Sequence, residues 1–167
     1  MARQALATAT VTTAGAVLAH QRVVPVGDQL AALFPEGGLR RGSTVCVGTG
    51  SSPGRTSLVL ALLAEPTRKG LWCAVVGLRD LGFVAAARAG AELERLAFVP
   101  SPGERWPVVV AAMLEGFDVV VVAPPRPATA PDARKLTARA RERSSVLVPV
   151  GQWPGPPDVR LDVTEVA

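Results

Sequence analysis

Short β-branched runs alternate with helix-forming segments along most of this chain. The runs carry few charges and are bounded by Gly, Pro or Asp, which is typical of strands buried on both faces of a sheet. Parallel strands need crossover connections, and the connecting helices cover the sheet. The pattern therefore predicts an α/β fold with a mostly parallel central sheet and helices on both faces. The clearest strands are predicted at 45–47, 72–76, 119–122 and 146–150.

The remaining segments complete this predicted domain, which we place at residues 23–167. A further strand is expected at 96–99, and an edge strand at 159–163 near the C-terminus, where apolar and polar residues alternate. Residues 1–22 are rich in alanine and threonine, so we expect a separate N-terminal arm or helix, or a poorly ordered tail. Helices are predicted at 56–64, 80–89, 106–114 and 131–143, with Asp80 as an N-cap and Pro131 in a first turn.

Composition limits the class of protein. With 167 residues, 49% hydrophobic and 19% charged, the chain is predicted to be globular rather than disordered. It shows neither a membrane-spanning run nor a hydrophobic leader, so a soluble cytoplasmic protein is expected. The net charge of +4 is compatible with nucleic-acid contact without specifying it. Cys46 and Cys73 fall in predicted strands, where buried free thiols are expected, and His20 is the single histidine of the sequence. Neither a metal site nor a cofactor is therefore predicted.

A glycine-rich loop follows the predicted strand at 45–47 and precedes the helix at 56–64. This is the setting of a phosphate-binding P-loop, whose pattern G-x-x-x-x-G-K-[ST] holds phosphates and Mg²⁺ with backbone N–H groups, a lysine and a hydroxyl. Thr49 stands where the first glycine belongs, and Arg55 replaces the lysine, which is not a conservative exchange. Two alternatives remain, a residual anion site and a turn without a ligand. The degenerate loop comprises Gly48, Gly50, Ser51, Ser52, Gly54, Arg55 and Thr56.

The carboxylates that ATP chemistry needs are also missing from their expected positions. The strand at 119–122 runs into Ala123, which cannot hold Mg²⁺ or its water. Asp118 lies at the opposite end of that strand, about 13 Å away at extended spacing. After the strand at 72–76 the chain reads Gly77-Leu-Arg79, without a carboxylate to activate water. A dead ATP site is therefore predicted, and no catalytic residue is assigned.

Several passages resemble the core of the RecA recombinase family. Val24-Pro-Val-Gly-Asp28, then Phe34-Pro-Glu-Gly-Gly-Leu-Arg-Arg-Gly-Ser-Thr-Val45, then the degenerate loop, are similar in order to the opening of that core. Within this superfamily the chain looks most like the ImuA-type proteins of actinobacteria. The resemblance covers roughly residues 23–165 and rests on order and context rather than on a diagnostic motif. The supporting passages are 71–77, 119–125, 139–143 and 148–155.

The resemblance implies a RecA-like P-loop core with a non-catalytic role. ImuA-type proteins are accessory subunits of the damage-induced (SOS) mutasome, which carries out error-prone translesion synthesis. They work with ImuB, an inactive Y-family polymerase homologue, and with a DnaE2-type polymerase. The expected partners are therefore an ImuB-type homologue, DNA and further copies of the chain, without a membrane. ATP hydrolysis and strand exchange are not carried over, because Arg55, Arg79 and Ala123 occupy the corresponding positions.

Two surfaces are candidates for contact with DNA or a protein partner. One is the helix predicted at 131–143, which is either a cationic stripe or an ordinary solvated face. The other is Trp153, which is either an anchor for a partner or base, or a cap on the core. Trp72 and Trp106 are expected in the core. The cationic residues of the helix are Arg134, Lys135, Arg139, Arg141 and Arg143.

The sequence leaves three function classes open. The first is a mutasome adaptor without ATP turnover. The second is a cell-division inhibitor of the SulA type, which resembles RecA in fold, has also lost the P-loop and would bind FtsZ. The third is a divergent P-loop ATPase that uses Arg55 in place of the lysine.

Overall fold

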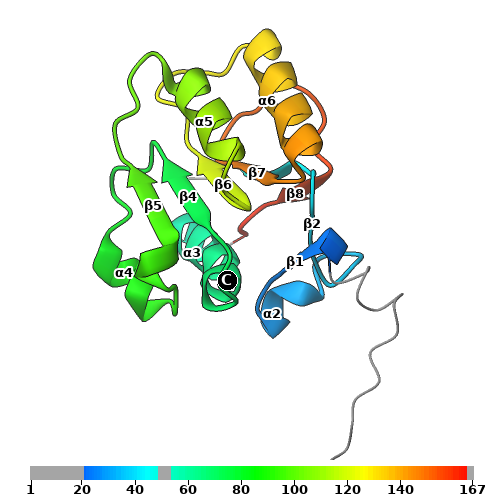
Figure 1. The fold of residues 1–167 in the computed structure, drawn as a ribbon, viewed down its shortest axis with the longest axis vertical. Coiled ribbons are helices and arrows are strands. Elements are labelled where there is room, and N and C mark those ends of the chain that lie inside the picture. Colours follow the sequence, from blue (N-terminus) through cyan, green and yellow to red (C-terminus); the bar gives the residue numbers. More distant parts are fainter. Residues whose placement is uncertain (1–20, 49–53, 165–167) are drawn as a thin grey trace, which may run out of the picture.

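A computed structural model describes residues 21–48 and 54–164 of the chain (Figure 1). Its main sheet is parallel, with the strand order β5-β4-β6-β7. The predicted α/β class with a mostly parallel sheet is confirmed. The strands of this sheet are β4 (Cys73–Val76), β5 (Leu96–Val99), β6 (Val119–Val122) and β7 (Val146–Pro149).

A second parallel pair extends the same layer beyond β7. β3 (Val45–Val47) pairs with β8 (Val159–Leu161), and two isolated parallel bridges, Thr44 to Leu147 and Val47 to Val150, join β3 to β7. β8 is therefore the edge strand expected near the C-terminus, although it ends at Leu161 rather than at residue 163. The parallel direction brings the carboxyl ends of β3, β4 and β6 to one edge of the layer.

Helices cover the two faces of this sheet and enclose a hydrophobic core on each side (Figure 1). Side chains of β6 alternate between the two cores, with Val119 and Val121 on the α3 side and Val120 and Val122 on the α5 and α6 side. The helices are α3 (Gly54–Arg68), α4 (Phe83–Arg88), α5 (Trp106–Leu114) and α6 (Ala130–Arg143), with a short 3₁₀ turn η1 (Leu93–Arg95) before β5. No helix among the described residues is long and apolar enough to cross a bilayer.

An antiparallel hairpin precedes the main layer. β1 (Val23–Pro25) pairs with β2 (Gly38–Arg40), and the short helix α2 (Asp28–Ala31) lies between them. These elements were not predicted, because Val23–Pro25 and Gly38–Arg40 contain proline, glycine and arginine rather than a continuous β-branched run, and their pairing depends on tertiary contacts. Gly38 permits the close pairing, since a Cβ at this position would lie 2.6 Å from the Val24 carbonyl oxygen. Residues 1–20 of the predicted arm lie outside the described residues.

Two helix predictions had wrong boundaries. α3 continues past the predicted end at residue 64, through Pro66 to Arg68. Proline removes one helical N–H, but Pro66 is buried on the core side, and the Thr67 hydroxyl donates to the Leu63 carbonyl at 2.8 Å. α4 begins at Phe83 with Gly82 at its N-cap, so the expectation that Asp80 caps this helix was wrong.

One carboxylate ties the amino ends of several elements together. Asp118 Oδ2 accepts a hydrogen bond from the Trp72 backbone N–H at 2.9 Å, at the start of β4. Asp118 Oδ1 accepts from Arg41 Nη1 at 2.8 Å, which brings in the turn after β2. The Asp118 carbonyl accepts from the Val146 N–H at 2.8 Å, at the start of β7. Asp118 therefore has a structural role at the amino edge of the sheet.

Replacing Asp118 with alanine should destabilise the protein by about 2–3 kcal/mol, because it removes a charged partner of Arg41 and leaves the Trp72 N–H unpaired. A double-mutant cycle with Arg41→Ala, measured by urea unfolding, should give a coupling energy of about 1 kcal/mol or more. The matched control is the cycle of Arg143→Ala with Glu115→Ala, a more exposed pair at 2.7 Å, where coupling below about 0.5 kcal/mol is expected. Equal coupling in both cycles would contradict the role assigned to Asp118.

Candidate functional site

The carboxyl ends of β4 and β6 are packed backbone to backbone. Gly77 follows β4 with a positive φ of 84°, and a Cβ built on it would overlap the Ala123 carbonyl oxygen. The Ala123 N–H donates to the Val76 carbonyl at 2.8 Å, and the Gly77 N–H donates to the Val99 carbonyl at 2.9 Å. No side chain, acidic or otherwise, fits at position 77 without moving the chain that follows β6. A side chain is therefore excluded at position 77, and position 123 holds alanine, so neither of these positions supplies a carboxylate.

An acidic side chain lies against the start of the degenerate loop. A Cβ on Gly48 would overlap Asp162 Oδ1, so this carboxylate occupies the space directly beside the Gly48 backbone. The contact is fixed by the Gly48 N–H, which donates to the Leu161 carbonyl at 2.8 Å. A negative charge at this place opposes the binding of a phosphate. In the sequence Asp162 is only a polar position of an edge strand, and nothing in its spacing indicates this contact.

The remaining loop residues divide into two groups. Gly50, Ser51 and Ser52 lie outside the described residues. Gly54, Arg55 and Thr56 form the first turn of α3 and are half-buried. Among the described residues, no cluster of three or more His, Cys, Asp or Glu side chains is placed to hold a metal ion.

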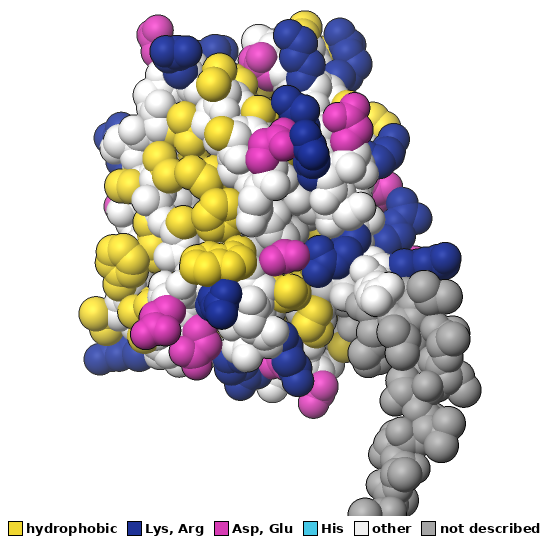
Figure 2. Space-filling model, viewed as in Figure 1, with side chains coloured by type: hydrophobic (Ala, Val, Ile, Leu, Met, Phe, Trp, Pro, Cys, Tyr) yellow, Lys and Arg dark blue, Asp and Glu magenta, His cyan; other side chains and the backbone are white. Residues whose placement is uncertain are grey.

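Some cationic side chains of helix α6 form ion pairs with a carboxylate, and others do not. Arg143 Nη2 lies 2.7 Å and Arg139 Nε lies 3.1 Å from the carboxylate of Glu115, which follows α5. Asp132 and Glu142 are acids of the same helix, whereas Glu115 could not be found from the sequence, because that contact depends on the packing of α5 against α6. Figure 2 shows Lys and Arg side chains gathered over α6. Those without an ion pair to a described residue are Arg134, Lys135 and Arg141, and all three are exposed.

Trp153 lies in the core, which favours one of the two alternatives left open for it, whereas Trp72 does not lie where it was expected. Trp153 is 7% exposed and its ring lies edge-on to Trp106, with centroids 6.5 Å apart, so it caps the core between α5 and the sheet. Trp72, which was expected in the core, is 43% exposed. It precedes β4 at the edge of the layer, where the Arg95 guanidinium lies 4.7 Å from its ring centroid and Phe117 contacts it edge-on. Trp106 is fully buried, as expected.

Both cysteines are buried free thiols, as predicted. Burial raises the pKa of Cys46 to about 11, and nearby Arg160 offsets part of that rise. Burial raises the pKa of Cys73 to about 12, with a further contribution from the charge of Asp118. Both thiols are therefore protonated at neutral pH, which does not suit a nucleophile or a metal ligand.

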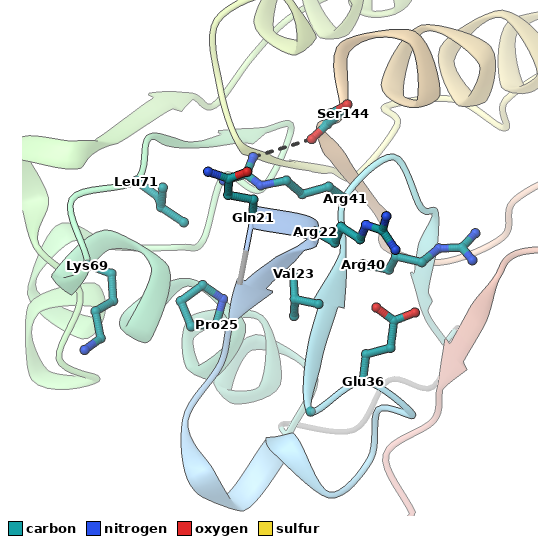
Figure 3. Close-up of a pocket in the computed structure, with 11 residues that line it drawn as sticks. Gln21, Arg22, Val23, Pro25, Glu36, Arg40, Arg41, Lys69, Leu71 and Ser144 are labelled. Carbon is teal, nitrogen blue, oxygen red and sulfur yellow. Dashed lines mark hydrogen bonds between the residues drawn. The ribbon is translucent and has the colours of Figure 1, made fainter. Parts of the chain in front are cut away.

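A cavity of about 1000 Å³ opens beside the β1–β2 hairpin, on the amino side of the sheet (Figure 3). Its positive charge is largely offset, because Arg41 pairs with Asp118 and Arg40 lies 3.6 Å from Asp158. Figure 3 also shows Arg41 extending toward the Ser144 carbonyl, to which it donates at 3.5 Å. The cavity was not indicated by any sequence motif. Its charged lining consists of Arg22, Arg40, Arg41, Lys69 and Glu36.

The contact between Gly77 and Ala123 can be tested with two glycines of similar conformation. Gly90 has φ of 91°, and a Cβ added to it would meet nothing within 4 Å, whereas the same atom at Gly77 meets a carbonyl. Gly90→Ala should cost about 1–2 kcal/mol from backbone strain alone. Gly77→Ala should cost more than about 3 kcal/mol, because strain and overlap add. Urea unfolding of the two variants measures the difference, and equal losses would show that the strand ends are not tightly packed.

Comparison with known proteins places this chain in a family. The model of a family described as the MT3502 N-terminal domain matches residues 32–155. Rv3395c, an uncharacterized protein of Mycobacterium tuberculosis, is 40% identical over 104 residues, which cover 61% of this chain and 51% of that protein. The chain thus spans about half the length of this curated relative.

A solved structure shares the fold. The crystal structure of SulA from Pseudomonas aeruginosa superposes with a TM-score of 0.53 at 19% identity, over 65% of this chain and 98% of that chain. At this identity the similarity concerns the fold alone. Because the family match covers most of the described sheet and its helices, the chain belongs to the MT3502 N-terminal domain family.

Proposed function

We propose that this chain is a non-catalytic, RecA-like accessory subunit of the damage-induced (SOS) mutasome. In this role it binds an ImuB-type polymerase homologue, works in one assembly with a DnaE2-type polymerase in error-prone translesion synthesis, and contacts DNA in the cytoplasm. The observation that carries the proposal is the closed carboxyl edge of the sheet, where the Ala123 carbonyl fills the space of a side chain at Gly77. A protein of this fold that keeps its core but closes this edge is suited to binding rather than to nucleotide chemistry.

Two further observations support the proposal. The degenerate loop follows β3 and precedes α3 in the chain, and the Asp162 carboxylate lies beside Gly48 at the start of that loop, where its charge opposes an anion. The fold is also shared with the SulA structure, and the resemblance drawn from the sequence places SulA-type proteins beside RecA as proteins that have lost the P-loop. A RecA-like core that has lost its phosphate site is consistent with both.

The shared fold equally favours a second candidate, a cell-division inhibitor of the SulA type that binds FtsZ. The two candidates differ in their partner rather than in their chemistry. The resemblance of passages such as 71–77 and 148–155 to ImuA-type proteins gives the mutasome role priority.

Co-expression should separate the two candidates. The tagged chain is expected to co-purify in a stable complex with an ImuB-type homologue from the same organism, and not with FtsZ. Size-exclusion chromatography with light scattering would give the mass of the complex. Retention of FtsZ without the homologue would support the SulA-type role and contradict the mutasome proposal.

Nucleotide binding tests the third possibility, a divergent ATPase. Calorimetric titration with ATP and Mg²⁺ is expected to show no saturable heat at millimolar nucleotide, because Arg55 replaces the P-loop lysine and Asp162 opposes an anion. Binding that is saturable, depends on Mg²⁺ and disappears in Arg55→Ala would support an ATPase instead. Arg134→Ala, which removes the same charge from the exposed face of α6, is the matched control.

A further inference from the structure

Two arginines of α6 that lack an ion pair form a stripe along the helix. Arg134 and Arg141 are exposed, lie seven residues apart and have no ion pair with a described residue. The residues three and four positions from either arginine are Ala, Pro, Thr or Ser, so the helix places no acid beside them. Arg139 and Arg143, by contrast, pair with Glu115. The α6 stripe of Arg134 and Arg141, about 10 Å long, therefore carries charge that no described side chain pairs with.

The β1–β2 hairpin extends the positive charge past the carboxyl end of α6. Gly42, in the turn after β2, packs against this end of the helix. A Cβ on Gly42 would lie 3.4 Å from the Arg141 Cα, and the Gly42 N–H donates to the Ser145 carbonyl at 3.1 Å. The Arg41 N–H donates to the Arg22 carbonyl at 2.8 Å. Backbone contacts therefore connect the α6 stripe with Arg22, which is exposed and has no ion pair with a described residue.

The cationic side chains of the hairpin reach the surface. Figure 2 shows Lys and Arg side chains over α6 and further down the same flank of the molecule, toward the hairpin. In Figure 3, Arg22 and Arg40 extend to the same side of the hairpin, whereas Arg41 extends the other way, toward Ser144. The Arg40 side chain is 58% exposed and its guanidinium lies 3.6 Å from the Asp158 carboxylate, so it can contact a further anion.

Most acids on this side of the molecule already have partners. Asp118 is bound by Arg41 and by the Trp72 N–H, and Asp158 accepts a hydrogen bond from the Thr44 N–H at 2.8 Å. Glu36 is the acidic member of the cavity lining beside the hairpin, where the other charged residues are cations. The charge that remains unpaired along α6 and the hairpin is therefore mainly positive.

Exposed aromatic rings lie elsewhere on the molecule. Among the described residues, they are Trp72 and Phe83. Trp72 contacts Arg95 and Phe83 contacts Phe98, next to β5 rather than α6. Stacking of the bases of an unpaired strand needs such rings. The surface along α6 is therefore suited to backbone phosphates, which are densest on a duplex, with one charge per about 1.7 Å of helix axis.

We propose that a cationic band, formed by Arg134, Lys135 and Arg141 of α6 with Arg22 and Arg40 of the hairpin, binds the phosphate backbone of duplex DNA without reading its sequence. The inference rests on the proposed accessory role and deepens it by naming the surface that contacts DNA. Cations without a carboxylate partner displace the counterions condensed on the phosphates, so binding weakens steeply as salt rises.

A labelled duplex tests the cationic band on the intact chain. The probe is a fluorescein-labelled DNA duplex of about 20 base pairs, titrated by fluorescence anisotropy between about 50 and 200 mM NaCl. Saturable binding is expected with a Kd on the order of 10 µM at the lowest salt, and the logarithm of the association constant should fall with the logarithm of salt concentration with a slope of about −4. A single strand of the same length should bind at least about threefold more weakly.

Arg134→Ala/Arg141→Ala and Arg79→Ala/Arg88→Ala form a matched pair of double variants. Each removes two positive charges from exposed side chains that have no ion pair with a described residue. Arg79 and Arg88 lie before and at the end of α4, on the other face of the sheet. The α6 variant should weaken duplex binding at least about tenfold at the lowest salt and make the slope shallower by about 2, whereas the α4 variant should change binding less than about twofold.

A single variant tests the extension onto the hairpin. Arg22→Ala should make the salt slope shallower by about 1, because it removes one phosphate contact. An unchanged slope would confine the contact to α6 and overturn the band. Thermal unfolding checks that all variants are folded.

The outcomes separate the cationic band from the proposed function. No saturable binding, equal losses in the two double variants, or tighter binding of the single strand would each overturn the band as a duplex site. Duplex binding with the expected slopes, but without co-purification of the ImuB-type homologue, would support the band and contradict the proposed partner. Co-purification that is lost in Arg134→Ala/Arg141→Ala, without DNA binding by the unaltered chain, would assign the stripe to the protein partner and overturn the DNA proposal.

Discussion

The whole domain depends on the burial of β6 on both faces. All four of its valines are inaccessible to solvent, and they alternate between the core under α3 and the core under α5 and α6. Burial of a valine side chain contributes on the order of 1.5–3 kcal/mol to the free energy of unfolding. Because β6 has valines in both cores, it contributes to the stability of each. β4 and β7 pair with it in parallel on either side. Every connection between these strands must then cross one face of the sheet.

The two ends of β6 are fixed in different ways. A carboxylate fixes the amino end, and main-chain packing fixes the carboxyl end. At the amino end, the Asp118 carboxylate joins β4 and the turn after β2 through Trp72 and Arg41. At the carboxyl end, the Ala123 backbone fills the space beside Gly77. The acidic residue of this strand is therefore used for stability at the amino edge. At the carboxyl ends of β4 and β6, on the edge where related folds place ligands, main-chain groups pack directly against one another.

The strands could be predicted from the sequence more completely than the site. The predicted ranges 45–47 and 119–122 coincide with β3 and β6, because a continuous β-branched run in a parallel sheet is buried on both faces and local composition identifies it. The β1–β2 hairpin and the extension of α3 past its predicted end depend on tertiary contacts, so both were missed. The decisive contacts of the site join residues far apart in the chain. The sequence shows that Gly48 lacks a side chain, but not that Asp162 occupies the space beside it. The exposure of Trp72 has the same origin, since its aromatic character favours burial and its place before the amino end of β4 leaves it partly exposed.

These contacts together give an α/β layer whose main-chain groups pack directly against one another at the carboxyl ends of β4 and β6. Because Gly77 and Ala123 are in direct main-chain contact, these two strand ends are packed as closely as the core. The layer is less complete at the apolar flank beyond β5, where Ala97 and Val99 remain partly exposed. An apolar flank is costly in a protein that acts alone, because it favours aggregation.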